Sequence, residues 1–484
     1  MQEERLNGRL WIAGEEVSAH SGGEIPVIDP ATGQILGHEA RGTEEDVDRA
    51  VNAAQKAFRS GQWQGLAAAD RGRLLIKLGQ RIRHERDRLA RILSLENGKP
   101  LRQAHDEVGT TIRNFEYFGG WADKILGSVI PISDDVFDYI RYEPLGVVGH
   151  IVPWNYPLDI FARGVAPCLA VGNTVVAKPA EETPFSTLEI AHLATEIGVP
   201  DGVINVVTGY GYEAGASLAA HGGIQALAFC GSIATGKEVL AAAAKNITPV
   251  VSLELGGKSP LILFDDGDVE RAARTSAHSI CYNAGQSCGA LSRLLVSENV
   301  EEQVQEIIGQ TLAKIRLGRG VENPDMGPLV SRGQLERVRA YIGDGQREGA
   351  TLAYGGRHPE EDPLSGGFFI EPALFRGAKP GMRIVEEEIF GPVIALMTFA
   401  SEEEAVQLAN GSIYGLSAEI WTSDLSRAHR VAHQLDVSHV TVNGGGGFGV
   451  QAPFGGVKQS GFGREGGWES IVQYSRVKNV WINL

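Results

Sequence analysis

Hydrophobic and polar positions between residues 144 and 207 alternate between two periodicities. Apolar runs short enough for buried strands lie at 146–152, 174–177 and 203–207, and segments with helical spacing lie between them at 159–169 and 187–197. Such alternation is typical of an open, mostly parallel, doubly wound α/β sheet. Because ligands of these sheets bind at the carboxyl ends of the strands, we expect functional residues in the loops that begin at Pro153 and Lys178.

The regions on either side have different patterns. Residues 9–40 have the pattern of short strands, and helices are expected from Thr43 and over 70–95. Residues 126–142 are apolar with a preference for strand, and they fit either a projecting hairpin or an ordinary surface loop. The last segment, 477–484, has the pattern of an apolar strand that needs a sheet or a partner subunit to cover it.

Composition narrows the range of partners. The chain has 484 residues, 43% of them hydrophobic, and a net charge of -16. This length predicts two or three domains, and the negative charge argues against nucleic acid or an anionic membrane as a partner. The N-terminus leads into no apolar signal segment, and no stretch has the roughly 18 apolar residues of a membrane helix. We therefore expect a cytoplasmic protein with small-molecule partners.

The cysteines include one candidate nucleophile. The four cysteines form neither a CxxC pair nor a cysteine–histidine spacing suited to zinc, so we expect no metal site and no disulfide framework. Cys288 differs from the others because small residues surround it, in Asn283-Ala-Gly-Gln-Ser-Cys288-Gly289. Glycine neighbours allow a ligand to approach the thiol and its backbone N–H. Local sequence leaves two interpretations open, a nucleophile and a buried cysteine that only packs.

Two further segments carry candidate chemistry. Glu254 lies inside the apolar strand 250–255, where burial without a partner raises a carboxyl pKa as a general base requires. Pairing with a structural arginine is the alternative. The turn Phe229-Cys-Gly-Ser232 leads from a strand into a helix and offers free N–H groups to a phosphate, although a plain glycine turn has the same pattern. Glycine patterns at 209–215 and 461–466 are weaker matches to a dinucleotide-binding motif.

Seven motifs follow one another in a single order along the chain. They are Pro153-Trp-Asn155-Tyr-Pro157, Lys178-Pro-Ala-Glu181, Phe229-Cys-Gly-Ser232 with Gly236, Glu254-Leu-Gly-Gly257, Gly285-Gln-Ser-Cys288, Glu388-Ile-Phe390-Gly-Pro392 and Pro453-Phe-Gly-Gly456. In this order they resemble the NAD(P)-dependent aldehyde dehydrogenase superfamily, in its non-phosphorylating form, along nearly the whole chain. The resemblance implies an α/β fold and a homodimer or homotetramer. It divides the chain into a split Rossmann-like dinucleotide-binding domain (1–124 and 145–256), a catalytic domain (257–470) and a small β oligomerisation hairpin (125–144 and 471–484).

The resemblance also implies roles for individual residues. Cys288 is the nucleophile, Asn155 and the Cys288 backbone N–H stabilise the oxyanion, and Glu254 activates water. The cofactor is NAD, with NADP as an alternative, and its contacts are Trp154, Lys178, Glu181, Gly231, Ser232, Gly236, Leu255, Glu388 and Phe390. The substrate tunnel is lined by Tyr156, Asp159, Arg163, Ser287, Gly289 and Phe448. Glu181 favours NAD because its carboxylate repels the 2′-phosphate of NADP.

The chain departs from the family pattern in its proton relay. Arg163-Gly164 stands where many relatives have Trp-Lys, so the relay lysine is missing, whereas Glu465 matches another relay position. Asp159 and Arg163 are four residues apart on a helix and either pair with each other or bias the tunnel toward polar or charged aldehydes. We expect NAD-dependent oxidation of an aldehyde to the acid through a thiohemiacetal and a thioester. The alternatives are a coenzyme A-acylating dehydrogenase, a thiol hydrolase and a catalytically silent binding protein on the same scaffold.

Overall fold

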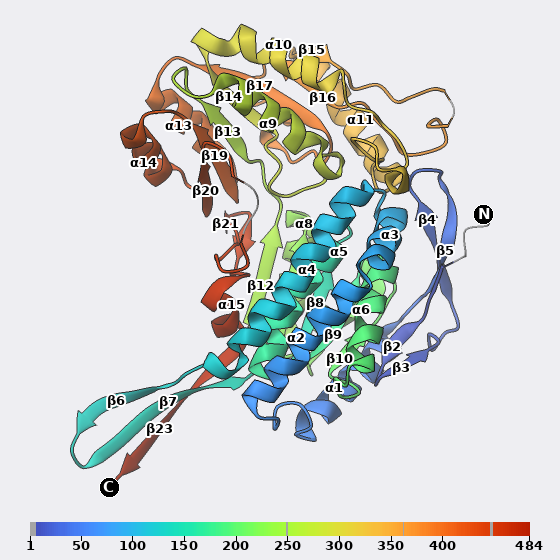
Figure 1. Ribbon diagram of the computed structural model, residues 1–484, viewed down its shortest axis with the longest axis vertical. Helices are drawn as coiled ribbons and strands as arrows, with labels where there is room; N and C mark the ends of the chain where they lie inside the picture. The colour runs from blue at the N-terminus through green and yellow to red at the C-terminus, as the bar shows by residue number, and fades with distance from the viewer. Residues whose placement is uncertain (1–5, 248–249, 362, 446–448) are drawn as a thin grey trace.

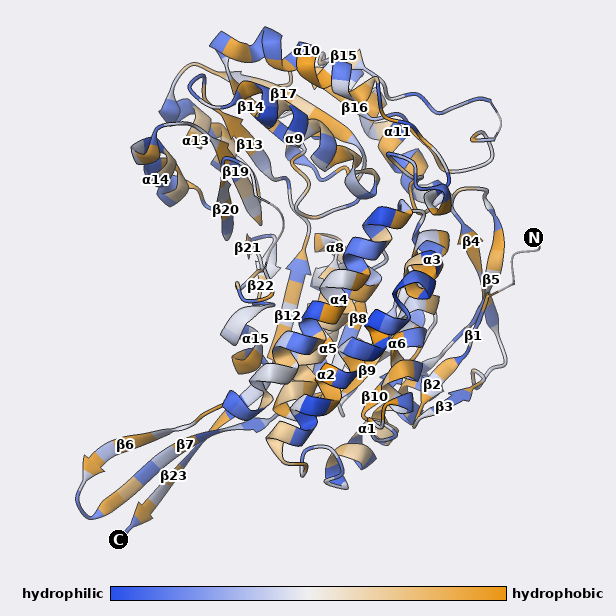
Figure 2. Cartoon of the chain, viewed as in Figure 1, coloured by the Kyte–Doolittle hydropathy of each residue, from blue (hydrophilic) through white to orange (hydrophobic). Residues whose placement is uncertain are grey.

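Two large sheets and a projecting hairpin make up the molecule (Figure 1). The computed structural model describes residues 6–247, 250–361, 363–445 and 449–484. Hydrophobic residues dominate the strands of both large sheets, whereas α2 (Ala68–His84) and α4 (Leu101–Trp121) show many hydrophilic residues to the viewer (Figure 2). The predicted α/β class is therefore confirmed.

The first large sheet has eight strands, in the order β22-β12-β11-β8-β9-β10-β2-β3. Their bounds are β22 (Gly461–Phe462), β12 (Val250–Leu255), β11 (Ala226–Gly231), β8 (Val147–Val152), β9 (Thr174–Pro179), β10 (Ile204–Val206), β2 (Leu10–Ile12) and β3 (Glu15–Val17). The five strands from β12 to β10 are parallel, as the strand and helix alternation predicts. All residues of β8 and β9 are buried because helices cover both faces of the sheet.

The helices of this sheet divide between its two faces. One core cluster contains residues of α2, α4, α5 (Pro157–Val171) and α6 (Phe185–Glu196), and the other contains residues of α1 (Glu44–Arg59), α7 (Ala216–Ala220) and α8 (Ile233–Ala243). The helix expected over 70–95 is in fact two helices, because α2 ends at His84 and α3 (Arg86–Asn97) begins after Glu85. Periodicity alone does not reveal this break, since hydrophobic spacing continues across it.

The second large sheet has seven strands, in the order β15-β16-β17-β14-β13-β19-β20. Its strands are β15 (Thr351–Tyr354), β16 (Ala373–Arg376), β17 (Val393–Phe399), β14 (Arg293–Ser297), β13 (Pro260–Leu263), β19 (Ser417–Trp421) and β20 (His439–Val442). Its helices include α9 (Val269–Cys281), α10 (Glu301–Leu312), α11 (Arg332–Arg347), α12 (Arg383–Glu386), α13 (Glu402–Asn410) and α14 (Leu425–Gln434). Strand β22 comes from the predicted catalytic segment, yet it pairs with β12 of the first sheet. The domain boundaries stay a prediction.

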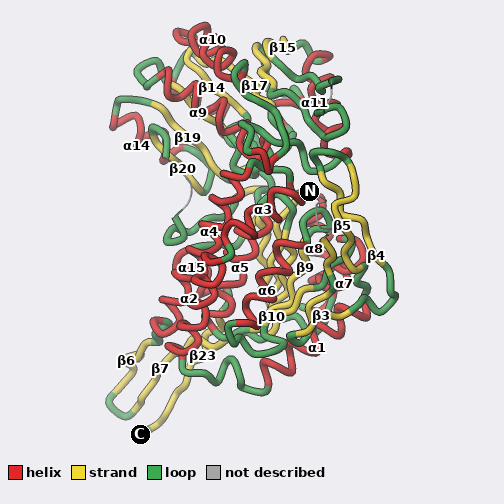
Figure 3. The backbone as a smooth tube through the Cα atoms, turned by 45° about the vertical axis from the view of Figure 1, so that its right-hand side comes forward, coloured by secondary structure: helices red, strands yellow, loops and turns green. Residues whose placement is uncertain are grey.

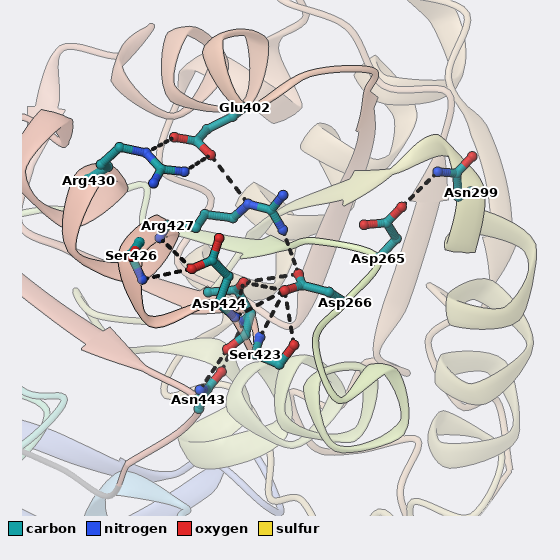
Figure 4. A network of polar contacts seen from close by, with 11 residues as sticks. Asp265, Asp266, Asn299, Glu402, Ser423, Asp424, Ser426, Arg427, Arg430 and Asn443 are labelled. Atoms are coloured by element: carbon teal, nitrogen blue, oxygen red, sulfur yellow. Dashed lines mark hydrogen bonds and ion pairs between the residues drawn. The ribbon is translucent and has the colours of Figure 1, made fainter.

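A polar network joins β13 to the start of α14 (Figure 4). Asp266 accepts hydrogen bonds from the Thr422 hydroxyl at 2.8 Å and from the backbone N–H of Asp424 at 3.1 Å, and it pairs with Arg427 at 2.7 Å. Arg427 also reaches Glu402 on α13 at 3.3 Å. The network fixes the turn between β19 and α14.

The third sheet is the hairpin of β6 (Ser128–Ser133) and β7 (Val136–Pro144), extended by β23 (Ser475–Asn483) near the C-terminus. Figure 3 shows these three strands extending away from the helical layer. The hairpin interpretation of 126–142 is therefore confirmed in preference to a surface loop. The last strand pairs with β7, but most of its side chains stay exposed. A fourth sheet near the N-terminus has β1 (Leu6–Gly8), β5 (Gln34–Ala40) and β4 (Glu24–Asp29). None of the described helices is long and apolar enough to cross a membrane.

Candidate active site

A strained turn presents Cys288. After α9 the chain makes a short 3₁₀ turn in which Asn283 (φ 49°), Ala284 (φ 53°) and Gly285 (φ 71°) are left-handed. Only glycine fits at 285, because a Cβ there would lie 2.4 Å from the carbonyl oxygen of Gly391. Gln286 holds the turn by donating to the Asn283 carbonyl at 3.0 Å and accepting from the Val330 N–H at 2.9 Å. Such strain persists only where the surroundings fix it, and it clusters at functional sites.

The Cys288 side chain lies where two cavities meet. One cavity of about 360 Å³ and another of about 270 Å³ both have Cys288 in their lining. Burial raises the pKa of the thiol to about 12, Glu388 and Glu254 act in the same direction, and Arg163 and the Gly289 N–H act against it. The thiol is therefore protonated at neutral pH and needs a base, or a nearby positive charge, to become a nucleophile.

Asn155 is held beside this thiol at the end of β8. The side-chain Nδ2 of Asn155 donates to the Gln286 carbonyl at 3.2 Å. The backbone carbonyl of Asn155 accepts from Lys99 Nζ at 2.8 Å and from Asn283 Nδ2 at 2.9 Å. One hydrogen of the Asn155 amide stays available, and Asn155 lines the 270 Å³ cavity together with Cys288. The Cys288 backbone N–H makes no hydrogen bond within the part of the chain that the structure describes. Two donors can therefore converge on one oxyanion.

Glu254 occupies the same cavity from β12, opposite Cys230 of β11. The residue is 6% exposed, and neither carboxyl oxygen has a hydrogen-bond partner among the described residues. Burial raises its pKa well above the usual value, Glu465 adds to this effect, and Arg163 and Arg464 act against it. The alternative of a glutamate paired to a structural arginine is therefore wrong. The carboxyl is unsatisfied and is suited to proton abstraction.

The rest of the 270 Å³ cavity carries groups that fit a dinucleotide. Ser232 caps α8, accepting from the Thr235 N–H at 3.2 Å, and the helix start offers further N–H groups to a phosphate. The Phe390 ring packs edge-on against Trp154 at 5.2 Å. Glu388 accepts from the Gly257 N–H at 2.9 Å, and burial raises the pKa of its carboxyl to about 7.

Not every predicted cofactor residue lines this cavity. Gly231, Leu255 and the residues named above do, whereas Lys178, Glu181 and Gly236 do not. Lys178 Nζ lies 3.1 Å from the Glu181 carboxylate at the end of β9, so this pair can address another part of a long ligand. A Cβ on Gly236 would lie 2.7 Å from Leu255, so this glycine allows α8 to pack against β12.

The 360 Å³ cavity contains the predicted tunnel residues that the structure describes, Tyr156, Asp159, Arg163, Ser287 and Gly289, together with Glu465. Phe448 lies outside the described residues. Arg163 is ion-paired with Glu465 and reaches Asp159 at 3.6 Å, so both acids share one guanidinium.

Sequence reasoning missed several residues of this cavity. They include Thr110, Arg113 and Asn114 of α4. Phe454, which stands in one of the seven motifs but has no role assigned from the sequence, also lines the cavity, and the centre of its ring lies 5.1 Å from the Arg163 guanidinium. Thr110, Arg113 and Asn114 recur at helical spacing, but nothing in the sequence indicates which face of α4 borders a cavity. A further cavity of about 540 Å³, with Glu419 and His439 in its lining, adjoins this one at Tyr156.

Comparison with known proteins agrees with this geometry. The family model described as "Aldehyde dehydrogenase family" matches residues 17–480. The chain belongs to the aldehyde dehydrogenase family. It is 40% identical to betaine aldehyde dehydrogenase of Bacillus subtilis (strain 168) over 481 residues, 99% of this chain and 98% of that one. It is 41% identical to the mitochondrial aldehyde dehydrogenase of Equus caballus over 490 residues, which are 100% and 96% of the two chains.

A solved structure gives the same result for the fold. The NAD+ complex of an aldehyde dehydrogenase from Bacillus cereus superposes with a TM-score of 0.96 at 43% identity, covering 99% of this chain and 97% of that one. The resemblance inferred from the seven motifs is therefore confirmed, and the chain is an oxidoreductase of this family.

At the position of the missing relay lysine, a Cβ on Gly164 would lie 2.4 Å from the His150 ring, so the imidazole takes up the space beside the helix.

Proposed function

We propose that this aldehyde dehydrogenase oxidises an aldehyde to the carboxylic acid with NAD, through a covalent adduct on Cys288. The observation that carries the proposal is the position of the thiol at the junction of two cavities. The 360 Å³ cavity, with Tyr156 and Asp159 in its lining, admits the aldehyde, and the 270 Å³ cavity holds the reactive end of the cofactor. Hydride transfer requires the cofactor to lie beside the aldehyde carbon that is bound to Cys288, and the junction of the two cavities allows this arrangement.

The residues divide the chemistry between them. The Cys288 thiol releases its proton to water, and Sγ then attacks the aldehyde carbon. The oxyanion of the thiohemiacetal accepts hydrogen bonds from Asn155 Nδ2 and the Cys288 N–H, each worth roughly 10²–10³ in rate. Bound NAD supplies the hydride acceptor for this carbon. An acyl thioester then stays on Cys288. Glu254 takes a proton from water, and the resulting hydroxide releases the acid and restores the thiol.

Residues at the cofactor side favour NAD over NADP. We assign Ser232 and the start of α8 to the pyrophosphate, the Lys178–Glu181 pair to the adenosine ribose, and Glu388 with Phe390 and Trp154 to the nicotinamide riboside. Lys178 is already paired with Glu181 at 3.1 Å, so a 2′-phosphate would meet a neutralised lysine and a carboxylate. Solved structures of relatives from Bacillus cereus and Staphylococcus aureus are complexes with NAD+.

The test is turnover of a panel of aldehydes. Aliphatic, aromatic, amino- and carboxy-aldehydes are mixed with the protein and NAD or NADP, and reduced nicotinamide is followed by absorbance, with Cys288→Ala as control. Turnover with NAD, lost in Cys288→Ala, supports the proposal. If calorimetry detects bound NAD but no aldehyde is oxidised, the proposal is wrong. Turnover only with added coenzyme A would instead favour the acylating alternative, which the unpartnered carboxyl of Glu254 disfavours.

We also propose a homo-oligomer in the cytoplasm. The projecting hairpin and β23 expose large apolar side chains that one chain leaves in water, and these are Val129, Ile132, Phe137, Val477, Trp481 and Ile482. A second copy of the chain would cover them. All four cysteines are free, as suits a reducing compartment. Light scattering after size exclusion tests the assembly, because a monomer at micromolar concentration would contradict it.

A further inference from the structure

A buried ion pair lies behind the turn that carries Asn155. Lys99, between α3 and α4, and Glu107, on α4, are ion-paired with side chains only 1% exposed. Neither residue lines the two cavities at Cys288. Burial lowers the pKa of Lys99 and raises that of Glu107, and each partner opposes the shift of the other.

Lys99 contacts two residues of the turn that line the cavities. Its Nζ donates to the Asn155 carbonyl at 2.8 Å and lies 4.4 Å from the centre of the Tyr156 ring. Two residues earlier, Asn97 Nδ2 donates to the Trp154 carbonyl at 2.9 Å. One short segment therefore fixes three consecutive residues between β8 and α5.

Glu107 fixes the other end of the same turn. Its Oε1 accepts from the backbone N–H groups of Leu158 at 2.9 Å and Asp159 at 3.3 Å, in the first turn of α5. Tyr156, the N-cap residue, makes no capping hydrogen bond through its side chain, so a carboxylate from α4 serves as the cap. Helix α5 in turn carries Asp159 and Arg163 into the tunnel.

Stability alone does not explain a buried pair of this kind. Replacing both members of a buried ion pair by neutral side chains is often neutral or stabilising, because desolvation offsets most of the attraction. The pair does fix the geometry of the turn that carries Asn155, because Lys99 contacts that turn and Glu107 caps the helix that follows it. Misplacement of a reacting group by about 1 Å can cost roughly a hundredfold in rate.

We propose that Lys99 and Glu107 are positioning residues for acylation, which hold the oxyanion donor Asn155 and the tunnel ring of Tyr156 in place relative to Cys288. The inference rests on the proposed function of Cys288 and Asn155. The pair lines neither cavity, and its side chains make no hydrogen bond with the described residues assigned to the cofactor. Its removal therefore slows formation of the thioester and weakens use of the aldehyde, but leaves the use of NAD unchanged.

The decisive variant is the double substitution Lys99→Met with Glu107→Gln. It leaves no buried charge unpaired, and the glutamine oxygen can still accept from the Leu158 N–H, so we expect folding at a melting temperature close to that of the wild type. The first-turnover burst of NADH in a stopped-flow instrument should slow by about tenfold, because the oxyanion donor loses its hydrogen bond from Lys99. KM for the aldehyde should rise, and KM for NAD should stay within about twofold.

Glu96→Gln is the matched control. Glu96 is also a fully buried carboxyl that caps a helix of this sheet, accepting from the backbone N–H of Phe185 at 2.8 Å and Ser186 at 3.2 Å, but it lies outside both cavities. Its burst should equal that of the wild type. A burst in the double variant within twofold of the wild type, or an equal slowing in Glu96→Gln, would overturn the proposal.

A crystal structure of the double variant gives a second readout that does not depend on turnover. We expect the Asn155 amide and the Tyr156 ring to shift relative to Cys288. If Asn155 Nδ2 still lies 3.2 Å from the Gln286 carbonyl and the ring is unmoved, the positioning role is wrong even if no aldehyde is turned over. A wild-type protein that binds NAD but forms no NADH with any aldehyde would contradict the proposed function instead.

Discussion

The Arg163 guanidinium is ion-paired with Glu465, 302 residues further along the chain, and the two charges act in opposite directions on Glu254. Arg163 lowers the pKa of the Glu254 carboxyl, whereas Glu465 raises it. A general base works in its deprotonated form, so activity is gained as the pH rises through its pKa. Burial has the largest effect on this pKa, and the ion pair adjusts the pH range in which Glu254 can activate water.

Substituting each partner should move the acid limb of the pH profile in opposite directions. In Arg163→Met the pKa of Glu254 rises, and the limb of kcat moves to higher pH by about one unit. In Glu465→Gln the acid limb of kcat moves to lower pH, because Arg163 still lowers the pKa of Glu254 and Glu465 no longer raises it. Steady-state rates between pH 5 and 10 measure both shifts. Shifts in the same direction would mean that another group controls this limb.

Glu254→Gln separates the two halves of the reaction. An amide cannot take a proton from water, so the thioester should form and then accumulate. We expect a first-turnover burst of NADH close to one per site, followed by a steady-state rate lower by about 10²–10⁴-fold. Stopped-flow absorbance measures the burst, and mass spectrometry detects the acylated protein. Loss of the burst itself would show that Glu254 acts first on the thiol of Cys288.

The sequence predicts this site better than it predicts the scaffold behind it. Cys288, Asn155 and Glu254 stand in short motifs whose residue types are tied to chemistry, and the structure brings all three to one cavity. The contacts of Lys99 and Glu107 carry no such signal. Glu107 lies on the buried face of α4 beside Val108, where a lone acid predicts burial of a charge but not its partner.

Contacts between segments that are far apart in the sequence also cannot be predicted from local patterns. Helical spacing allows Asp159 and Arg163 to pair, and they do so at 3.6 Å. The shorter contact of Arg163 is with Glu465, which no local pattern indicates, because it depends on where the chain returns to the first sheet. The resemblance already placed Asp159 and Arg163 in a tunnel, but the pairing of Arg163 with Glu465 required the fold.

Alkylation should report the protonation state of Cys288. Because burial raises the pKa of this thiol to about 12, modification by iodoacetamide should be slow at pH 7 and accelerate by about tenfold per pH unit up to pH 9. Peptide mapping after timed quenching measures the rate at this residue. Cys281 and Cys168, both buried, serve as internal controls and should stay unmodified. A rate independent of pH in this range would mean that the thiol is already ionised.

Glu96 should make the stability of the fold depend on pH. Burial raises the pKa of its carboxyl from 4.5 to about 8, although the N–H groups of Phe185 and Ser186 act against this. The folded state therefore binds the proton more tightly than the unfolded chain. The resulting stability is complete below pH 4.5 and is lost as the pH rises toward 8, by up to about 1.4 kcal/mol per pH unit.

Glu96→Gln carries no ionisable group at this position and should remove that loss. Melting temperatures of both proteins at pH 5.5 and pH 8.5 give the comparison, because every other titrating group is common to the two. We expect the wild type to lose more stability than the variant between these pH values. An equal loss in both would mean that Glu96 is already ionised in the fold at pH 5.5, held in that form by the two N–H groups at the start of α6.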